Sequence, residues 1–99
     1  MRVNVQSVHF DADKKLITYI ESKLSKLTQF FDEIVEAEVI LKLEKDSNLE
    51  NKVTEIKLGI KGNDLFAKRN NKTFEQATDD VIEALKSQII KHKEKVKQL

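Results

Sequence analysis

A chain of 99 residues has room for one hydrophobic core, and we expect a single domain over residues 1–99. It contains no cysteine, which excludes disulfides, thiolate metal sites and cysteine redox chemistry and agrees with a cytoplasmic location. The net charge is only +1, so a polyanionic partner would have to bind a local patch of lysines rather than the surface as a whole.

The first half of the chain predicts a strand, a helix and a second strand. Residues 2–6 alternate around two valines, as a short strand does. Asp11 or Asp13 can cap the helix that follows, because a carboxylate accepts from free N–H groups. Its apolar stripe comprises Leu16, Ile20, Leu24, Leu27 and Phe31, broadened by Ile17, Phe30 and Ile34. A period of two then predicts a strand with these residues facing the core: Val35, Ala37, Val39, Leu41 and Leu43.

The second half predicts two more strands and a long helix. Residues 46–48 indicate a turn, residues 54–61 alternate as a third strand, and Lys61-Gly62-Asn63-Asp64 predicts a hairpin turn before a fourth strand over 65–69. Thr73 and Gln76 have the spacing of a capping box. The stripe of the last helix comprises Phe74, Ala77, Val81, Leu85 and Ile89, extended by Val96. Its acids, among them Asp79, Asp80 and Glu83, come early and its lysines late, which matches the helix dipole.

The element order β-α-β-β-β-α predicts an α+β fold in two layers. A four-stranded sheet with one apolar face needs cover, and two amphipathic helices are available, so we expect both helices to pack on the same face. The last four elements share the arrangement of double-stranded-RNA-binding domains. This likeness concerns the fold and does not by itself indicate a function.

The inventory of reactive side chains argues against an enzyme. The only histidines are His9 and His92, and the chain has no HExxH, no GxSxG and no glycine-rich phosphate loop. Its carboxylates alternate with lysines on faces that we expect to be solvated. We therefore expect no catalysis, no cofactor, no metal and no small-molecule substrate. No apolar run is long enough to span a bilayer, so no membrane is expected.

Lysines gather on both helices at helical spacing. On the first helix the stripe is Lys15, Tyr19, Lys23 and Lys26. On the last helix one flank holds Lys86, Lys93 and Lys97, another holds Lys91 and Lys95, and His92 lies near the apolar stripe. Helices packed side by side would join these flanks into a basic surface with a groove, where lysines bind phosphates and Tyr19 stacks or donates a hydrogen bond. The helix dipole and solubility also explain such lysines, so the pattern leaves both interpretations open.

Three stretches resemble the ribosome hibernation promoting factors. Residues 23–27, followed by Phe30, Phe31, Asp32 and Ile34, are similar to the end of the first helix in that family. Residues 39–45 are similar to the strand that follows, and residues 88–95 to the closing segment. The three stretches occur in order along essentially the whole chain, whose length resembles the short form of the family.

This resemblance implies a function and a set of site residues. Members of the family bind the small ribosomal subunit in the channel used by messenger and transfer RNA, and inhibit translation in stationary phase or under stress. The implied RNA-binding residues are Lys23, Lys26, Lys91, His92, Lys93 and Lys95. Lys86 stands nearest to the basic residues that the family usually has at Ala84 and Ser87. Lys15, Tyr19 and Lys97 are further candidate contacts, and other hibernation factors are further candidate partners.

A second hypothesis is a protein-interaction module. Some relatives carry a sigma-modulation name, and the charged outer face of the predicted sheet offers a surface for a sigma factor. This hypothesis predicts salt-tolerant binding to a protein and no binding to ribosomes.

Overall fold

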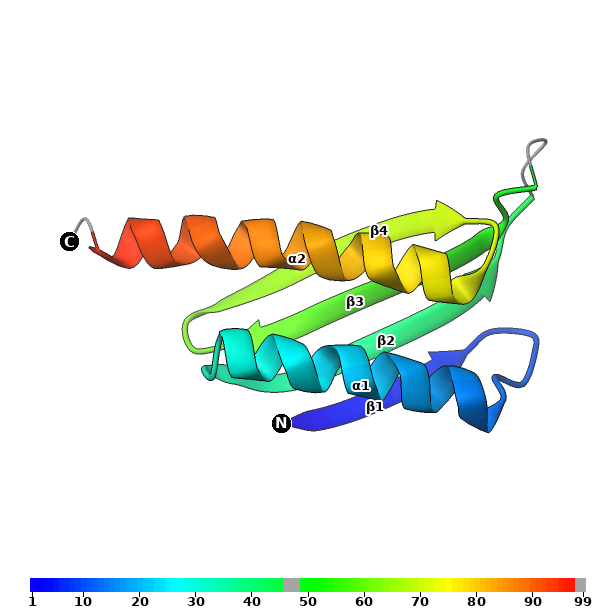
Figure 1. Ribbon diagram of the computed structural model, residues 1–99, viewed down its shortest axis with the longest axis horizontal. Helices are drawn as coiled ribbons and strands as arrows, with labels where there is room; N and C mark the ends of the chain where they lie inside the picture. Colours follow the sequence, from blue (N-terminus) through cyan, green and yellow to red (C-terminus); the bar gives the residue numbers. More distant parts are fainter. Residues whose placement is uncertain (46–48, 98–99) are drawn as a thin grey trace.

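The computed structural model describes residues 1–45 and 49–97, the last two of these by their backbone alone. The elements are β1 (Arg2–Ser7), α1 (Lys14–Phe30), β2 (Ile34–Leu43), β3 (Lys52–Ile60), β4 (Asn63–Asn71) and α2 (Phe74–Lys97), as Figure 1 shows. This order confirms the predicted β-α-β-β-β-α succession. The predicted turn at 46–48 and the side chains of Val96 and Lys97 lie outside the described residues.

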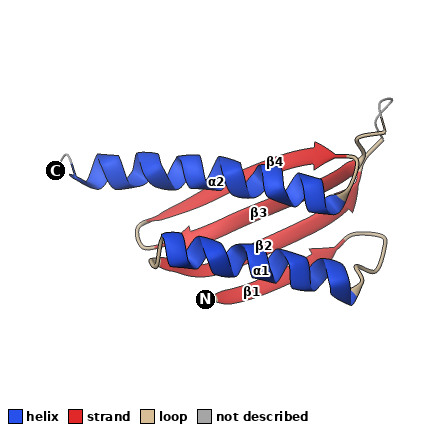
Figure 2. Ribbon diagram, in the orientation of Figure 1, coloured by secondary structure: helices blue, strands red, loops and turns tan. Residues whose placement is uncertain are grey.

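The four strands form one sheet in the order β1-β2-β3-β4. β1 runs parallel to β2, which requires the crossover through α1, whereas β3 and β4 follow as antiparallel neighbours. Figure 2 shows both helices lying over the same face of this sheet. The predicted two-layer α+β fold is therefore confirmed. The C-terminal end of α2 extends past the β3–β4 turn (Figure 1).

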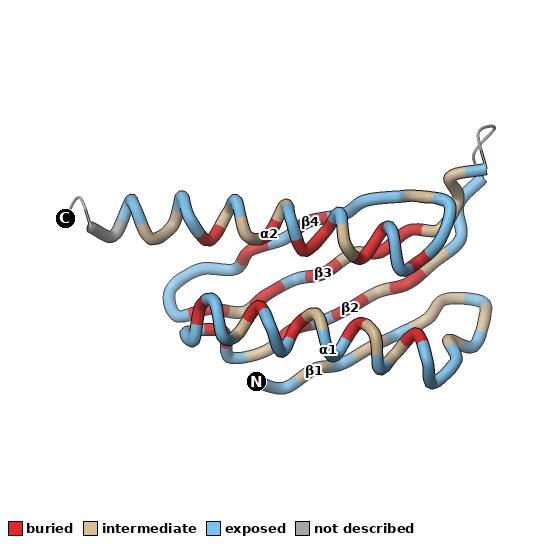
Figure 3. Tube along the Cα trace, in the orientation of Figure 1, coloured by how far each residue is buried: buried red, intermediate tan, exposed pale blue. Residues whose placement is uncertain are grey.

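The hydrophobic core is formed by buried residues of the sheet and of both helices, and Figure 3 shows such buried positions recurring along these elements. The helices contribute buried residues at the predicted spacing: Leu16, Ile20, Leu24 and Leu27 from α1, and Val81, Leu85 and Ile89 from α2. The hydroxyl groups of the buried Thr54 and Thr78 lie 3.3 Å apart and hydrogen-bond each other. Burial of this shared apolar surface supplies the main driving force for folding.

The predicted pattern of β2 is wrong at two positions. Val35 is 58% exposed and Leu43, the last residue of the strand, is 50% exposed. The register between β2 and β3 shifts between Ile34 and Glu36, and a bulge of this kind turns one side chain out of the alternation. Ile34 takes the buried place at this end of the strand. It belongs to β2, because α1 ends at Phe30.

The predicted caps and turns are confirmed in part. Asp13, rather than Asp11, is the N-cap of α1, and its Oδ1 accepts from the Leu16 N–H at 2.8 Å. Thr73 Oγ1 accepts from the Gln76 N–H at 3.1 Å, as in a capping box. The Gln76 side chain, however, accepts from the Thr73 hydroxyl at 3.2 Å and not from the Thr73 backbone N–H. The hairpin turn needs positive φ only at Gly62, where φ is 81°, so β4 begins already at Asn63.

Candidate nucleic-acid interface

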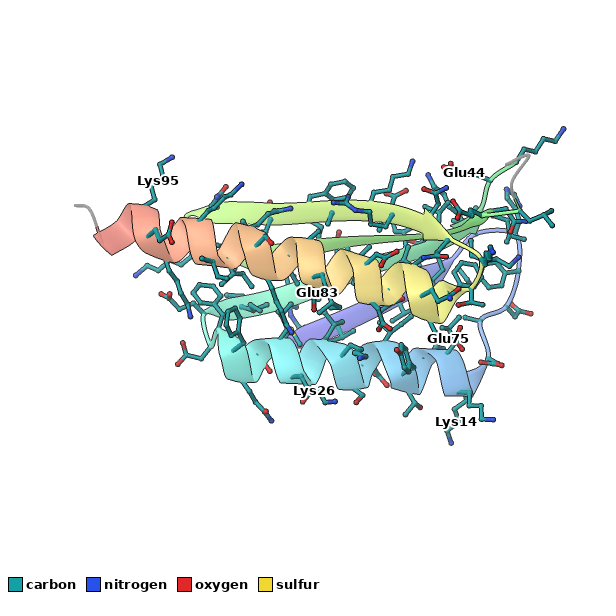
Figure 4. All side chains as sticks on the ribbon, turned by 45° about the horizontal axis from the view of Figure 1, so that its top comes forward. Lys14, Lys26, Glu44, Glu75, Glu83 and Lys95 are labelled. Atoms are coloured by element: carbon teal, nitrogen blue, oxygen red, sulfur yellow. The ribbon has the colours of Figure 1, made fainter. Side chains whose placement is uncertain are left out.

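A groove of about 240 Å³ lies between α1 and α2, which run side by side in Figure 4. Its lining is Lys23 and Lys26 from α1 and Asp79, Ile82, Glu83 and Lys86 from α2. The predicted meeting of basic flanks from the two helices is thus present in the structure. Lys15 is exposed on the first turn of α1 and does not line this groove.

Asp79 organises one wall of the groove. Its Oδ1 accepts the Tyr19 hydroxyl at 2.7 Å and lies 3.4 Å from Lys23 Nζ. Lys23 Nζ also lies 5.4 Å from the centre of the Tyr19 ring. The hydrogen bond to Asp79 raises the pKa of Tyr19 above its ordinary value, and the charge of Asp79 raises the pKa of Lys23. The structure therefore places Tyr19 in a pair with Asp79, rather than among the freely exposed groups expected from its helical spacing.

This arrangement predicts an unusual titration for Tyr19, the only tyrosine in a chain without tryptophan. A raised pKa means that the folded state favours the neutral phenol; this stabilisation is present below pH 10 and lost as the pH rises through the folded pKa. The tyrosinate absorbance should rise with a midpoint above 10 in the native protein. Asp79→Ala should move the midpoint towards the ordinary value. Equal midpoints in both proteins would contradict the pairing.

The remaining groove lysines differ in their partners. Lys86 Nζ lies 3.7 Å from Glu83 Oε1, one helical turn away. Lys26 is exposed and, among the described residues, has no ion pair. The sequence pattern explains Asp79 and Glu83 by the helix dipole and does not predict their place in the groove. Their spacing to Lys86, of seven and three residues, was the signal that puts all three on one flank of α2.

Lys93 crosses from α2 to the end of α1. Its Nζ donates to the backbone oxygen of Phe30 at 3.2 Å and lies 4.6 Å from the centre of the Phe30 ring and 5.6 Å from that of the Phe31 ring. The last turn of α1 has no basic residue of its own. Lys93 therefore supplies the positive charge that the C-terminus of α1 favours, and fastens the two helices together.

A second hollow, of about 330 Å³, lies between the other flank of α2 and the β3–β4 turn. Lys91, His92 and Lys95 line it together with Gln88, Asn63, Asp64 and Leu65. His92 is half-buried and packs edge-on against Phe31, with ring centres 6.0 Å apart. Gln88 bonds both the N–H and the C=O of Phe66, at 3.3 and 2.7 Å, which fixes α2 to the edge strand β4. Among the described side chains, Lys86 and Lys93 thus face α1 and Lys91 and Lys95 line the hollow, in agreement with the two predicted flanks.

The outer face of the sheet pairs most of its charges internally. Lys42 Nζ lies 2.7 Å from Glu55 and 3.4 Å from Glu44, and Lys68 lies 3.2 Å from Glu44. The hydrogen bond to Glu55 raises the pKa of Lys42, and the one from Lys68 lowers the pKa of Glu44. Paired charges of this kind leave little net field for a polyanion, so the helix layer is the better candidate surface.

Metal-binding clusters and membrane-spanning helices do not occur in the described part of the chain. Over residues 1–45 and 49–97, no three histidine or carboxylate side chains gather as they would around a metal ion. Within the same residues, neither helix is long and apolar enough to cross a membrane.

Comparison with known proteins gives a consistent set of relatives. The family model described as "Sigma 54 modulation protein / S30EA ribosomal protein" matches residues 3–97. A ribosome hibernation promoting factor of Klebsiella oxytoca is 33% identical over 103 residues, which cover 99% of each chain. One of Pseudomonas putida is 34% identical over 99 residues, which cover 100% of this chain and 93% of the relative.

Two solved structures share the fold. A ribosomal subunit interface protein from Coxiella burnetii superposes with a TM-score of 0.85 at 20% identity, covering 94% of this chain and 98% of the other. The N-terminal domain of Protein Y from Thermus thermophilus superposes with a TM-score of 0.76 at 20% identity, covering 90% and 96%. At 20% identity the similarity establishes the fold alone.

Proposed function

Because the chain belongs to the family of sigma 54 modulation proteins and S30EA ribosomal proteins, we propose that it is a ribosome-associated hibernation factor. In this proposal it binds the small ribosomal subunit through ribosomal RNA, in the channel used by messenger and transfer RNA. It thereby inhibits translation in the cytoplasm during stationary phase or stress. Relatives named ribosome hibernation promoting factor match almost their whole length, which confirms the family resemblance predicted from the sequence motifs.

The observation that carries the RNA part of the proposal is the gathering of lysines on both flanks of α2 and in the groove between the helices. Lys23, Lys26 and Lys86 line the interhelical groove, and Lys91 and Lys95 line the hollow on the far side of α2. Lysines so placed neutralise phosphates as point charges and release counterions. Catalytic chemistry is not part of the proposal.

Salt dependence is the direct test of this proposal. The purified protein should co-sediment saturably with small ribosomal subunits at about 50 mM monovalent salt, and binding should fall steeply towards about 200 mM, because each phosphate contact releases a counterion. Failure to bind subunits at low salt would overturn the proposal. Salt-tolerant capture of a sigma factor, together with that failure, would instead support the protein-interaction hypothesis.

A further inference from the structure

Two of the three lysines in the interhelical groove are engaged by carboxylates that line the same groove. Asp79 lies 3.4 Å from Lys23, and Glu83 lies 3.7 Å from Lys86. Asp79 is the better positioned of the two acids, because the Tyr19 hydroxyl donates to it at 2.7 Å and fixes its orientation. A phosphate that entered the groove to reach Lys23 would therefore meet a carboxylate already in contact with that ammonium group.

We infer that Asp79 sets the RNA affinity of the groove by competing with phosphate for Lys23. This inference rests on the proposed function and deepens it, since it assigns a residue that opposes binding. Carboxylate and phosphate oxygens are equivalent acceptors for a lysine ammonium group, so Lys23 must leave one to engage the other. The side chains of Lys23 and Asp79 are 32% and 47% exposed, which leaves both accessible to such an exchange.

Asp79 has two opposing effects on the affinity of Lys23 for phosphate. Their relative sizes decide whether Asp79 raises or lowers that affinity. It holds Lys23 in the groove before RNA arrives, which favours binding by reducing the entropy lost. That benefit is small, because contact with the Tyr19 ring also restrains Lys23 and does not need the carboxylate. Against it stand the loss of the ion pair and the repulsion between Asp79 and the incoming phosphate. Competition therefore outweighs preorganisation.

The competition has a consequence for the choice of RNA. Phosphate contacts carry no sequence information and supply essentially all of the affinity for unspecific RNA. Because Asp79 lowers the affinity of the groove for any phosphate, it weakens the binding of unspecific single-stranded RNA. A target that also engages Lys91 and Lys95, on the other flank of α2, offsets the penalty with contacts that Asp79 does not reach.

The test uses Asp79→Asn, whose amide oxygen still accepts the Tyr19 hydroxyl but carries no charge. Affinities are measured for a short uridylate oligonucleotide and for small ribosomal subunits across a salt series. The variant should bind both about three- to tenfold more tightly than the wild type at low salt, the size expected for release of an exposed ion pair together with a nearby like charge. Its salt slope on the oligonucleotide should steepen by about 0.7 for one added phosphate contact.

Two control variants separate charge from loosening of the fold. Glu21→Gln removes the same charge from an exposed residue of α1 that, two positions from Tyr19, does not face the groove. Tyr19→Phe removes the hydroxyl that holds Asp79 but keeps the carboxylate. Glu21→Gln should bind the oligonucleotide no more tightly than the wild type does, and any gain in Tyr19→Phe should be smaller than that in Asp79→Asn, because the carboxylate remains.

The possible outcomes are distinct. Equal affinities for Asp79→Asn and Glu21→Gln would overturn the role of Asp79, as would an equal gain in Tyr19→Phe. A gain of Asp79→Asn on the oligonucleotide, with no protein binding the subunits, would support the competition while overturning the proposed function. No binding of any variant to either probe would overturn both.

Discussion

Replacing Lys91 and Lys95 together by alanine is expected to weaken binding to small ribosomal subunits roughly 30- to 150-fold at low salt, because each interaction that is removed costs about 1–1.5 kcal/mol. Both lysines are exposed on α2 and line the hollow beside the β3–β4 turn. Neither has an ion pair among the described residues, so both are free to meet phosphate. The magnitude of the salt slope should fall by about 1.4–1.8, because two phosphates are no longer neutralised.

The matched control removes two lysines from the opposite end of the helix layer. Lys14 begins α1 and Lys72 precedes α2, both exposed, and neither lines the groove or the hollow. Lys14→Ala/Lys72→Ala changes the net charge by the same amount, so it should weaken binding only slightly. Co-sedimentation titrations at several salt concentrations measure both variants. Equal losses of affinity in the two double variants would show that net charge, rather than this end of α2, governs binding.

Lys93→Ala is expected to lower the stability of the fold more than it lowers the affinity for RNA. Its ammonium group bonds the backbone oxygen of Phe30 and lies over the Phe30 and Phe31 rings, so the substitution removes a helix-end charge and a cation–π contact, together about 1–2 kcal/mol. For a chain of this size that lowers the thermal midpoint by roughly 4–16 °C. Thermal and denaturant unfolding followed by circular dichroism measure this loss.

Two comparisons test that assignment. Lys93→Met keeps the apolar stem over the Phe30 ring, so it should recover part of the lost stability without the charge. Lys91→Ala removes a lysine two residues away that makes no such contact, and should leave the unfolding midpoint nearly unchanged. A Lys93→Ala protein that is as stable as the wild type but binds RNA poorly would instead place Lys93 among the RNA contacts implied by the family resemblance.

The local sequence pattern was sufficient to predict the helices and strands and the lysine flanks of the candidate site. The spacing of Leu16, Ile20 and Leu24 depends only on the helical repeat, and the Asp13 cap joins groups three residues apart. The lysine flanks of α1 and α2 follow from the same repeat. These features depend on neighbours within one or two turns, so the amino-acid order alone specifies them.

Only the tertiary structure decided which of these side chains are paired with other groups and which are free to bind a partner. The Tyr19–Asp79 hydrogen bond joins residues 60 positions apart, and the Lys93–Phe30 bond joins residues 63 positions apart. The outward turn of Val35 depends on the register between β2 and β3. Helical spacing predicted that Lys23, Lys26 and Lys86 would share a surface, but not that Asp79 would engage Lys23. Sequence periodicity determines the direction of a side chain on its own element, whereas its partner depends on how separate elements pack.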